Sequence, residues 1–360
     1  MGLIASLIAQ WCQPRMSLRN SRTVISPQVS RVLVVGKFPN PTFDYYFAAR
    51  LSAPGMPPFK LLDIRNFDSR SVEADGAFVI IVRYASKAVS RWIRNHRDTL
   101  AAVAVFLDDD VSALITGREA TLSYRYRLLR NSILPLRNLD GMIDELWVST
   151  EMLARRLSYA EPRLLPPAPS PAMLPAAKPG SHSSQPITIA YHATAIHVDE
   201  HRFLAPIIRR VLQIRRNAEF EVFAEGRNAK IWFDLGLDRV TVRRSLPWQS
   251  YLKEHQDRSI DIMLVPVAPG HVNDCRAETK RIDIARLNAA AILSSCPAFA
   301  NAEEGEILLA YDEALWEQHL IALIDDSKAR AQSAMATRRR VETLISQFSA
   351  GIPWIMDRGP

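Results

Sequence analysis

The sequence predicts an α/β protein of two domains, each built around a parallel β-sheet. Short apolar runs alternate with amphipathic helical stretches, which is typical of parallel sheets covered by helices on both faces. The alternation is interrupted once, at residues 162–186, by a segment rich in proline, serine and alanine. The chain has 360 residues, of which 48% are hydrophobic, and this is enough for two cores of ordinary size.

The clearest strand of the first half is the run from Arg31 to Gly36, which is apolar and ends in glycine, as a buried parallel strand does before a loop. The pattern before the interruption also predicts strands at 77–82, 103–107 and 145–148 and helices at 43–51, 87–96 and 151–157. We expect a leader at residues 1–25 and a first domain at 26–161.

The alternation resumes after the linker at 162–186 and predicts a second domain at 187–326. The most convincing strand of the whole chain is the run at 260–267. The other predicted elements are strands at 187–191, 220–224, 240–242 and 291–294 and helices at 201–214, 248–255, 277–289, 313–324 and 327–348.

Composition excludes several classes of protein. The net charge is +7, but the densest basic cluster is only three residues long, at 338–340, and no nucleic-acid-binding motif accompanies it. We therefore expect anionic ligands such as nucleotide phosphates, lipid headgroups or acidic glycans, and no nucleic acid. The three cysteines fit neither a zinc site nor a disulfide framework, so a reducing cytoplasm is the simplest setting.

The first eleven residues, MGLIASLIAQW, are apolar but too short to span a bilayer, which takes about 20 residues. They lack a basic stretch before the apolar run and so make a poor secretory signal. Two interpretations stay open: an interfacial helix that touches a membrane, or a leader without a structural role. The first would place the protein in the cytoplasm at the inner face of the membrane.

The segment with the clearest chemistry follows the strand at 260–267. A loop leads into the helix predicted at 277–289, whose free N–H groups suit a nucleotide diphosphate. Arg276 and Lys280 are four residues apart and would add positive charge on one helix face, while the carboxylate of Asp283 could bind ribose hydroxyls. The alternative is a solvated helix whose charged residues pair with one another.

A second candidate site is the acidic triplet Asp108, Asp109 and Asp110, which follows the strand predicted at 103–107. Asp108 or Asp109 could act as the general base that takes a proton from an acceptor hydroxyl. The alternative is a helix N-terminus at which acidic side chains complement the helix dipole. Three adjacent acids could also bind a hard cation.

The segment after residue 260 resembles the donor-binding region of bacterial GT-B glycosyltransferases, in the group similar to glycosyltransferase family four. The matching residues, in order, are Asp261, Leu264, Pro266, Asn273, Arg276, Glu278, Lys280 and Asp283. The resemblance implies a GT-B-like fold, with two facing Rossmann-like domains and a cleft between them. It also implies that Arg276 and Lys280 hold the diphosphate and Asp283 the ribose.

Two positions depart from the family pattern. Asp283 replaces a glutamate, and Cys275 stands where many members carry the earlier of two glutamates. Near the start of the second domain, His197 matches a family histidine, so we predict a catalytic role for it; a helix-capping or surface histidine is the alternative. The resemblance further implies that the helix from about Ser327 returns to the first domain, where Trp354 would be buried.

The function implied by the resemblance is transfer of a sugar from a nucleotide-diphosphate sugar to a glycan or glycolipid acceptor, in bacterial cell-surface polysaccharide synthesis. The nucleotide sugar is a substrate, and we expect no further cofactor. We expect no metal either, because metal-dependent acidic sites belong to the other major glycosyltransferase fold. Two alternatives remain: a non-catalytic GT-B-like protein that binds a nucleotide or a partner, and an epimerase of nucleotide sugars.

Overall fold

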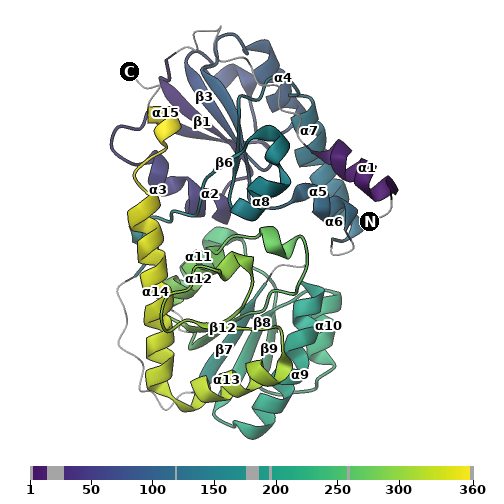
Figure 1. Ribbon diagram of the computed structural model, residues 1–360, viewed down its shortest axis with the longest axis vertical. Coiled ribbons are helices and arrows are strands. Elements are labelled where there is room, and N and C mark those ends of the chain that lie inside the picture. Colours follow the sequence, from purple (N-terminus) through teal and green to yellow (C-terminus); the bar gives the residue numbers. More distant parts are fainter. Residues whose placement is uncertain are drawn as a thin grey trace. The chain divides into compact units, whose positions relative to one another are not determined.

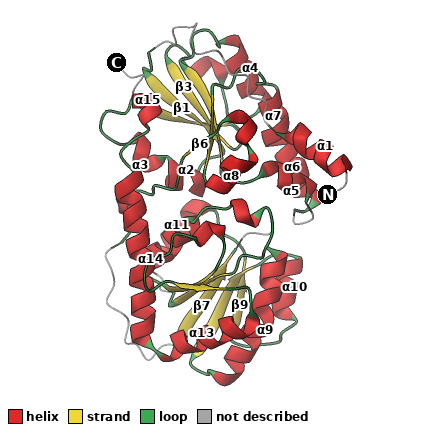
Figure 2. Ribbon diagram, in the orientation of Figure 1, coloured by secondary structure: helices red, strands yellow, loops and turns green. Residues whose placement is uncertain are grey.

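The computed structural model describes residues 3–13, 28–117, 120–175, 186–193, 197–257 and 260–356. The chain divides into two compact α/β units (Figures 1 and 2). The first consists of Met1–Ser170, Cys275–Ala277 and Ser346–Pro360, and the second of Pro171–Asp274 and Glu278–Ile345. Of the helices in these described ranges, none is long and apolar enough to cross a bilayer.

The first unit contains a six-stranded sheet in the order β2-β1-β3-β4-β5-β6, in which all neighbouring strands are parallel. The central strands β3 and β4 are buried at every position, which explains why they read as continuous apolar runs. The strands β2 and β6 were not predicted, because edge strands with exposed residues lack that signal. The strands are β1 (Arg31–Gly36), β2 (Phe59–Asp63), β3 (Ala77–Val82), β4 (Ala102–Leu107), β5 (Glu145–Val148) and β6 (Arg163–Leu164).

Five helices of the first unit, α2, α4, α5, α6 and α8, begin at a side chain that caps them. In α8 the hydroxyl of Thr150 accepts a hydrogen bond from the amide of Leu153 at 3.2 Å. The single helix expected at 43–51 is broken at Phe47, where the backbone leaves helical geometry (φ −121°, ψ −37°), and forms α2 and α3. The helices are α1 (Leu3–Cys12), α2 (Pro41–Tyr46), α3 (Ala48–Leu51), α4 (Lys87–Asn95), α5 (Val111–Thr116), α6 (Leu122–Leu128), α7 (Leu134–Arg137), α8 (Glu151–Arg156) and α15 (Pro353–Met356).

Both ends of the chain contribute to the first unit. The helix α1 lies against α5, and the guanidinium of Arg137 donates a hydrogen bond to the carbonyl of Trp11 at 2.8 Å. At the other end, the ring of Trp354 in α15 packs on the buried ring of Trp147, with 5.4 Å between centroids. The residues predicted as a leader beyond Gln13 lie outside the described ranges.

The second unit contains a six-stranded sheet in the order β12-β11-β10-β7-β8-β9, again with parallel neighbours only. The strands are β7 (Ile187–His192), β8 (Ala218–Phe223), β9 (Val240–Arg243), β10 (Ile262–Val265), β11 (Ala290–Ser294) and β12 (Ile307–Leu309). All but β12 were predicted. The helices are α9 (Val198–Ile214), α10 (Arg227–Phe233), α11 (Trp248–Asp257), α12 (Thr279–Leu287), α13 (Glu313–Asp325) and α14 (Ser327–Phe348).

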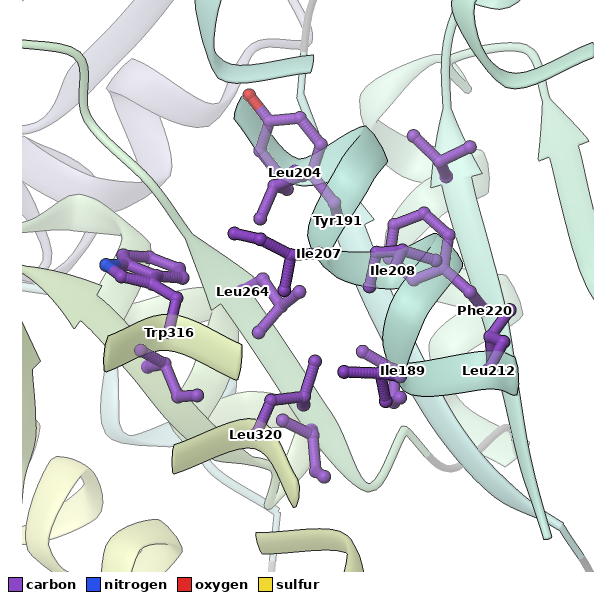
Figure 3. Packing of buried hydrophobic residues seen from close by; sticks show 14 of the residues in the cluster. Ile189, Tyr191, Leu204, Ile207, Ile208, Leu212, Phe220, Leu264, Trp316 and Leu320 are labelled. Carbon is purple, nitrogen blue, oxygen red and sulfur yellow. The ribbon is translucent and has the colours of Figure 1, made fainter. Parts of the chain in front are cut away.

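Alternate residues of the second sheet enter two cores. Ile189 and Leu264 face a cluster that α9 and α13 complete with side chains such as Ile208 and Trp316 (Figure 3). The neighbouring positions, among them Met263, face the opposite core with residues of α12. This alternation with a period of two is what a parallel sheet between two helical layers requires. The two cores hold the carboxyl ends of β7 and β10 side by side.

Candidate functional site

The topology of the second sheet defines where a ligand can bind. The chain runs from β7 to β8 and β9 on one side, then returns to place β10 on the other side of β7. Neighbouring strands whose connections leave in opposite directions form a crevice at their carboxyl ends, and open α/β sheets bind ligands there. The segments that follow β7 and β10 at this switch point carry His197, Asn273 and Arg276, and α12 after the second segment carries Lys280 and Asp283.

Lys280 is placed at this switch point by α12. Its ammonium donates a hydrogen bond to the main-chain carbonyl of His192, the last residue of β7, at 3.0 Å. The side chain of Lys280 is 40% exposed, so the ammonium can also reach a ligand. Asp283 lies one turn later on the helix and its carboxylate is 3.4 Å from the ammonium. The structure therefore brings these two predicted residues together.

Asp283 is buried and lies between two cations. Besides Lys280, it has the guanidinium of Arg286 at 3.9 Å, which stacks over the ring of Tyr251 at 4.9 Å from the centroid. Burial raises the pKa of Tyr251 well above its usual value, and the charge of Asp283 adds to this shift. Arg286 was not predicted as a site residue, although its position three residues after Asp283 was a usable signal.

Arg276 does not share a helix face with Lys280, and this part of the prediction is wrong. The helix α12 begins at Thr279, not at Ala277, so Arg276 precedes it and helical spacing does not relate the two cations. Residues Cys275–Ala277 group with the first unit, whereas Lys280 belongs to the second.

Glu278 is held by protein arginines. Its two carboxylate oxygens lie 2.7 and 2.8 Å from the guanidinium of Arg340 on α14, and Arg281 donates to it at 2.7 Å. Arg281 is fully buried and also binds Glu306 at 2.8 and 2.7 Å. Glu278 thus belongs to a buried ionic network that anchors α12 to α14, and its predicted contact with a nucleotide has no support in this geometry.

Asn273 and His197 converge on Glu200, a residue that sequence reasoning missed. The amide of Asn273 donates to Glu200 at 3.3 Å and to the carbonyl of Ala268 at 2.7 Å, while His197 lies 3.5 Å from the same carboxylate. Burial alone would raise the pKa of Glu200, but the contact with His197 and the backbone amide of Ala268 lower it to about 2. This carboxylate joins the loop after β10 to the start of α9.

A cluster of buried ionisable side chains lies next to Lys280. His192 bridges Glu221 at 3.0 Å and the hydroxyl of Tyr251 at 3.2 Å, and His255 provides a further imidazole close by. Two imidazoles and a carboxylate are the ligands of many transition-metal sites. Arg243 pairs with Glu221 at 3.2 Å, and both ring nitrogens of His192 have partners, so these two residues are satisfied without an ion. The Nδ1 atom of His255 lies 2.8 Å from the carbonyl of Tyr251, whereas its buried Nε2 atom has no hydrogen-bond partner among the described residues.

In the first unit, Arg83 organises the predicted acidic triplet. Arg83 follows β3 in the left-handed backbone region (φ 59°), which is uncommon for a residue other than glycine and often marks a functional site. Its guanidinium lies 2.7 Å from the carboxylate of Asp108 and also pairs with Asp109. Burial raises the pKa of Asp108, although the charge of Arg83 opposes this shift. Asp110 instead caps α5 through the amide of Ala113 at 2.9 Å.

The three predicted acids therefore have two roles. Asp110 is the helix-capping residue that the alternative interpretation described. Asp108 and Asp109 remain at the carboxyl end of β4, and the hydroxyl of Thr42 donates to Asp108 at 3.0 Å.

No protein-family model matches this sequence, and no curated protein matches it significantly. Solved structures match its fold. WaaG, described as a glycosyltransferase involved in lipopolysaccharide biosynthesis, is 12% identical, with a TM-score of 0.56 over 88% of this chain and 97% of WaaG. The N-terminal domain of Candida albicans trehalose-6-phosphate phosphatase is 10% identical, with a TM-score of 0.58 over 92% of this chain and 99% of that domain.

TarM is a further match, 10% identical with a TM-score of 0.54, and the match covers 79% of this chain but only 54% of TarM. The chain thus spans about half the length of TarM. At such identities the likeness concerns the fold alone. Together with the two parallel six-stranded sheets, it identifies the fold of this chain as GT-B-like, with two Rossmann-like units.

Proposed function

We propose that this chain is a glycosyltransferase that takes a nucleotide-diphosphate sugar as its donor and binds it in the second unit. The carrying observation is the position of Lys280 and Asp283, which α12 places at the switch point between β7 and β10. A half-exposed ammonium suits a diphosphate, and a carboxylate next to it suits ribose hydroxyls. Arg276 stays a candidate for the diphosphate, on the strength of the sequence resemblance alone.

The neighbours in fold support the same class of donor. WaaG is described as a glycosyltransferase of lipopolysaccharide biosynthesis, and a TarM variant was crystallised with UDP. On this basis we propose a glycan or glycolipid acceptor and a role in bacterial cell-surface polysaccharide synthesis, at the cytoplasmic face of the membrane. The exposed residues Leu7, Ile8 and Trp11 on α1 would supply a peripheral membrane contact.

We assign the acceptor side to the first unit, with Asp108 as the general base. Its raised pKa favours proton uptake, and Arg83 and Thr42 fix its orientation. His197 is a positioning residue in this proposal, because it lies 3.5 Å from the carboxylate of Glu200.

The proposal is tested first by ligand binding. The thermal stability of the full chain is measured with uridine, guanosine and thymidine diphosphates. A ligand that binds only the folded state adds about 2.7 kcal/mol of stability at 100 times its dissociation constant. We expect one of the three to raise the melting temperature; absence of any shift would contradict a nucleotide donor.

Turnover is tested second. The chain is incubated with the sugar conjugate of the bound nucleotide and without acceptor, and free nucleotide diphosphate is measured. Slow release of the diphosphate and free sugar is expected of a transferase. Nucleotide binding without release or transfer would favour the non-catalytic GT-B-like alternative, and conversion to a second nucleotide sugar would favour an epimerase.

A further inference from the structure

The first sheet has its own switch point, between β1 and β3. The chain places β2 on one side of β1 and then returns to place β3 on the other. Lys37 directly follows β1, and Arg83 and Tyr84 directly follow β3. These side chains therefore start from the two strand ends between which an open α/β sheet binds its ligand.

Two arginines, Arg127 of α6 and Arg130 of the turn after it, belong to a segment that packs against the loop after β3. A π-helical turn, Leu129–Ile133, separates α6 from α7, and the carbonyl of Asn131 in this turn accepts a hydrogen bond from the amide of Ala85 at 2.8 Å. The contact holds the segment with Arg127 and Arg130 against the loop after β3. Single π-helical turns inside helices occur frequently at functional sites.

Aromatic rings line the same place. The ammonium of Lys37 lies 4.9 Å from the ring centroid of Tyr84, and the guanidinium of Arg127 stacks over Tyr124 at 4.8 Å. Lys37 and both tyrosines are half-buried, whereas Arg127 and Arg130 are exposed. The cations are thus accessible from solvent, beside ring faces of the kind on which sugars pack.

The charges at this edge are not balanced. Arg65 is paired with Asp63, and Arg83 is paired with Asp108 and Asp109. Burial lowers the pKa of Lys37, and the positive charges of Arg127, Arg65 and Arg130 lower it further, whereas the negative charge of Asp63 opposes this shift.

The three remaining cations are Lys37, Arg127 and Arg130, and within the described ranges no ion pair joins any of them to a carboxylate. Neighbouring cations that repel one another are stabilised by an anion that accepts hydrogen bonds from all of them. Because no carboxylate of the described residues forms an ion pair with these three cations, a bound anion would stabilise them.

We propose that Lys37, Arg127 and Arg130 form a phosphate-binding site at which the first unit takes an acceptor that carries a phosphate group. As an acceptor site it rests on the proposed function, whereas the binding of phosphate does not. Two sources supply this chemistry: a soluble sugar phosphate, or a phosphate in a lipid headgroup.

The test is calorimetric titration of the full chain with a hexose phosphate, with the uncharged methyl hexoside and with inorganic phosphate. We expect the hexose phosphate to bind at least about tenfold more tightly than the methyl hexoside. Lys37→Met, Arg127→Gln and Arg130→Gln should each weaken this binding by about tenfold. Arg91→Gln, at an exposed arginine of α4, is the matched control and should bind like the wild type. Arg127 and Arg130 are exposed, so their variants should fold.

The second arm replaces the hexose phosphate by vesicles of phosphatidylcholine with or without phosphatidylglycerol. Binding that requires phosphatidylglycerol and is lost in the Lys37 variant, without binding of the hexose phosphate, would support the site and assign it to a lipid phosphate. The proposal is overturned if the three variants match the wild type in both arms, or if Arg91→Gln loses as much as they do.

The outcome is separable from that of the donor proposal. Uridine diphosphate is titrated into the same variants, and Lys37→Met should bind it as the wild type does. Failure of the donor proposal would appear as a wild-type chain that binds no nucleotide diphosphate. Failure of the present inference would appear as phosphate binding that is insensitive to all three substitutions.

Discussion

The ammonium of Lys280 lies 3.0 Å from the main-chain carbonyl of His192, so α12 is joined to the carboxyl end of β7 at the switch point of the second sheet. Because the side chain stays 40% exposed, this contact positions the ammonium without removing it from solvent. The ammonium of Lys280 is therefore held in place and still accessible to a ligand.

Lys280→Met should weaken the binding of a nucleotide diphosphate by about tenfold or more, because a hydrogen bond to a charged group contributes about 1.5–3 kcal/mol. The binding of the parent nucleoside should change far less, since it offers no anion to the ammonium. Calorimetric titration of both ligands checks this. Lys230→Met is the matched control, because Lys230 is an exposed lysine of α10 in an i,i+4 pair with Asp234. Equal losses in the two variants would contradict a specific role for Lys280.

Asp283→Asn should weaken nucleoside and nucleotide diphosphate alike, because the side chain keeps its shape but exchanges one acceptor oxygen for a donor. The same titrations check it. The substitution also leaves Arg286 and Lys280 with less negative charge nearby, so the free energy of unfolding is measured in parallel. Unchanged affinity for both ligands would place the ribose elsewhere.

Arg281→Met should destabilise the second unit without a direct effect on the ligand site. Arg281 is fully buried, and its removal leaves the buried carboxylate of Glu306 without its partner. Breaking such a pair costs about 3–5 kcal/mol. Urea unfolding measures the loss. The double variant Arg281→Met with Glu306→Leu should recover part of the lost stability; no recovery would show that the pair itself is not the cause.

The stability of the second unit should fall as the pH is lowered from about 6.5 towards 4. Burial lowers the pKa of His201 to about 4, and its Nδ1 accepts a hydrogen bond from the indole of Trp232 at 2.9 Å. Between about pH 4 and pH 6.5 the unfolded chain binds a proton at this histidine that the folded chain does not. Lowering the pH through this window therefore favours the unfolded state.

The full shift corresponds to about 3 kcal/mol between these limits. Urea unfolding between pH 4.5 and 7.5 measures it. His201→Gln keeps an acceptor for Trp232 but does not titrate, so its stability should depend less on pH in this range. A profile identical to that of the wild type would assign the pH dependence to other groups.

Asp108→Asn should abolish sugar transfer while nucleotide binding persists, because Asp108 belongs to the first unit and the proposed donor site to the second. Asp110→Asn is its control: asparagine still caps α5, so both transfer and stability should be retained. Transfer at the wild-type rate by Asp108→Asn would exclude this residue as the base. Transfer is measured with the donor and acceptor that the binding experiments identify.

The alternation of strands and helices could be predicted from the sequence because each element shows its own spacing of apolar residues over a short stretch of chain. The strands β3, β4 and β10 are buried on both faces and therefore read as apolar runs, whereas the edge strands β2, β6 and β12 lack this signal. The loops after β4 and β10 were also visible, since parallel strands carry their functional loops at the carboxyl ends.

The partner of each charged or polar side chain could not be predicted from the sequence, because many of these partners lie far away along the chain. Glu278 pairs with Arg340, 62 positions later, and Asn273 binds Glu200, 73 positions earlier. The sequence predicts that Arg276 shares a helix face with Lys280, but α12 begins at Thr279, so Arg276 precedes the helix.

By itself, then, the sequence determined two α/β units with parallel sheets and the strand ends near which ionisable residues gather. Only the tertiary structure decided which of those residues form ion pairs within the protein, as Asp109 does with Arg83. It also decided which of them keep a charge that a ligand can reach, as Lys280 does. The physical reason is that secondary structure follows from neighbouring residues, whereas the pairing of a charge follows from which distant segments the fold brings within hydrogen-bonding distance.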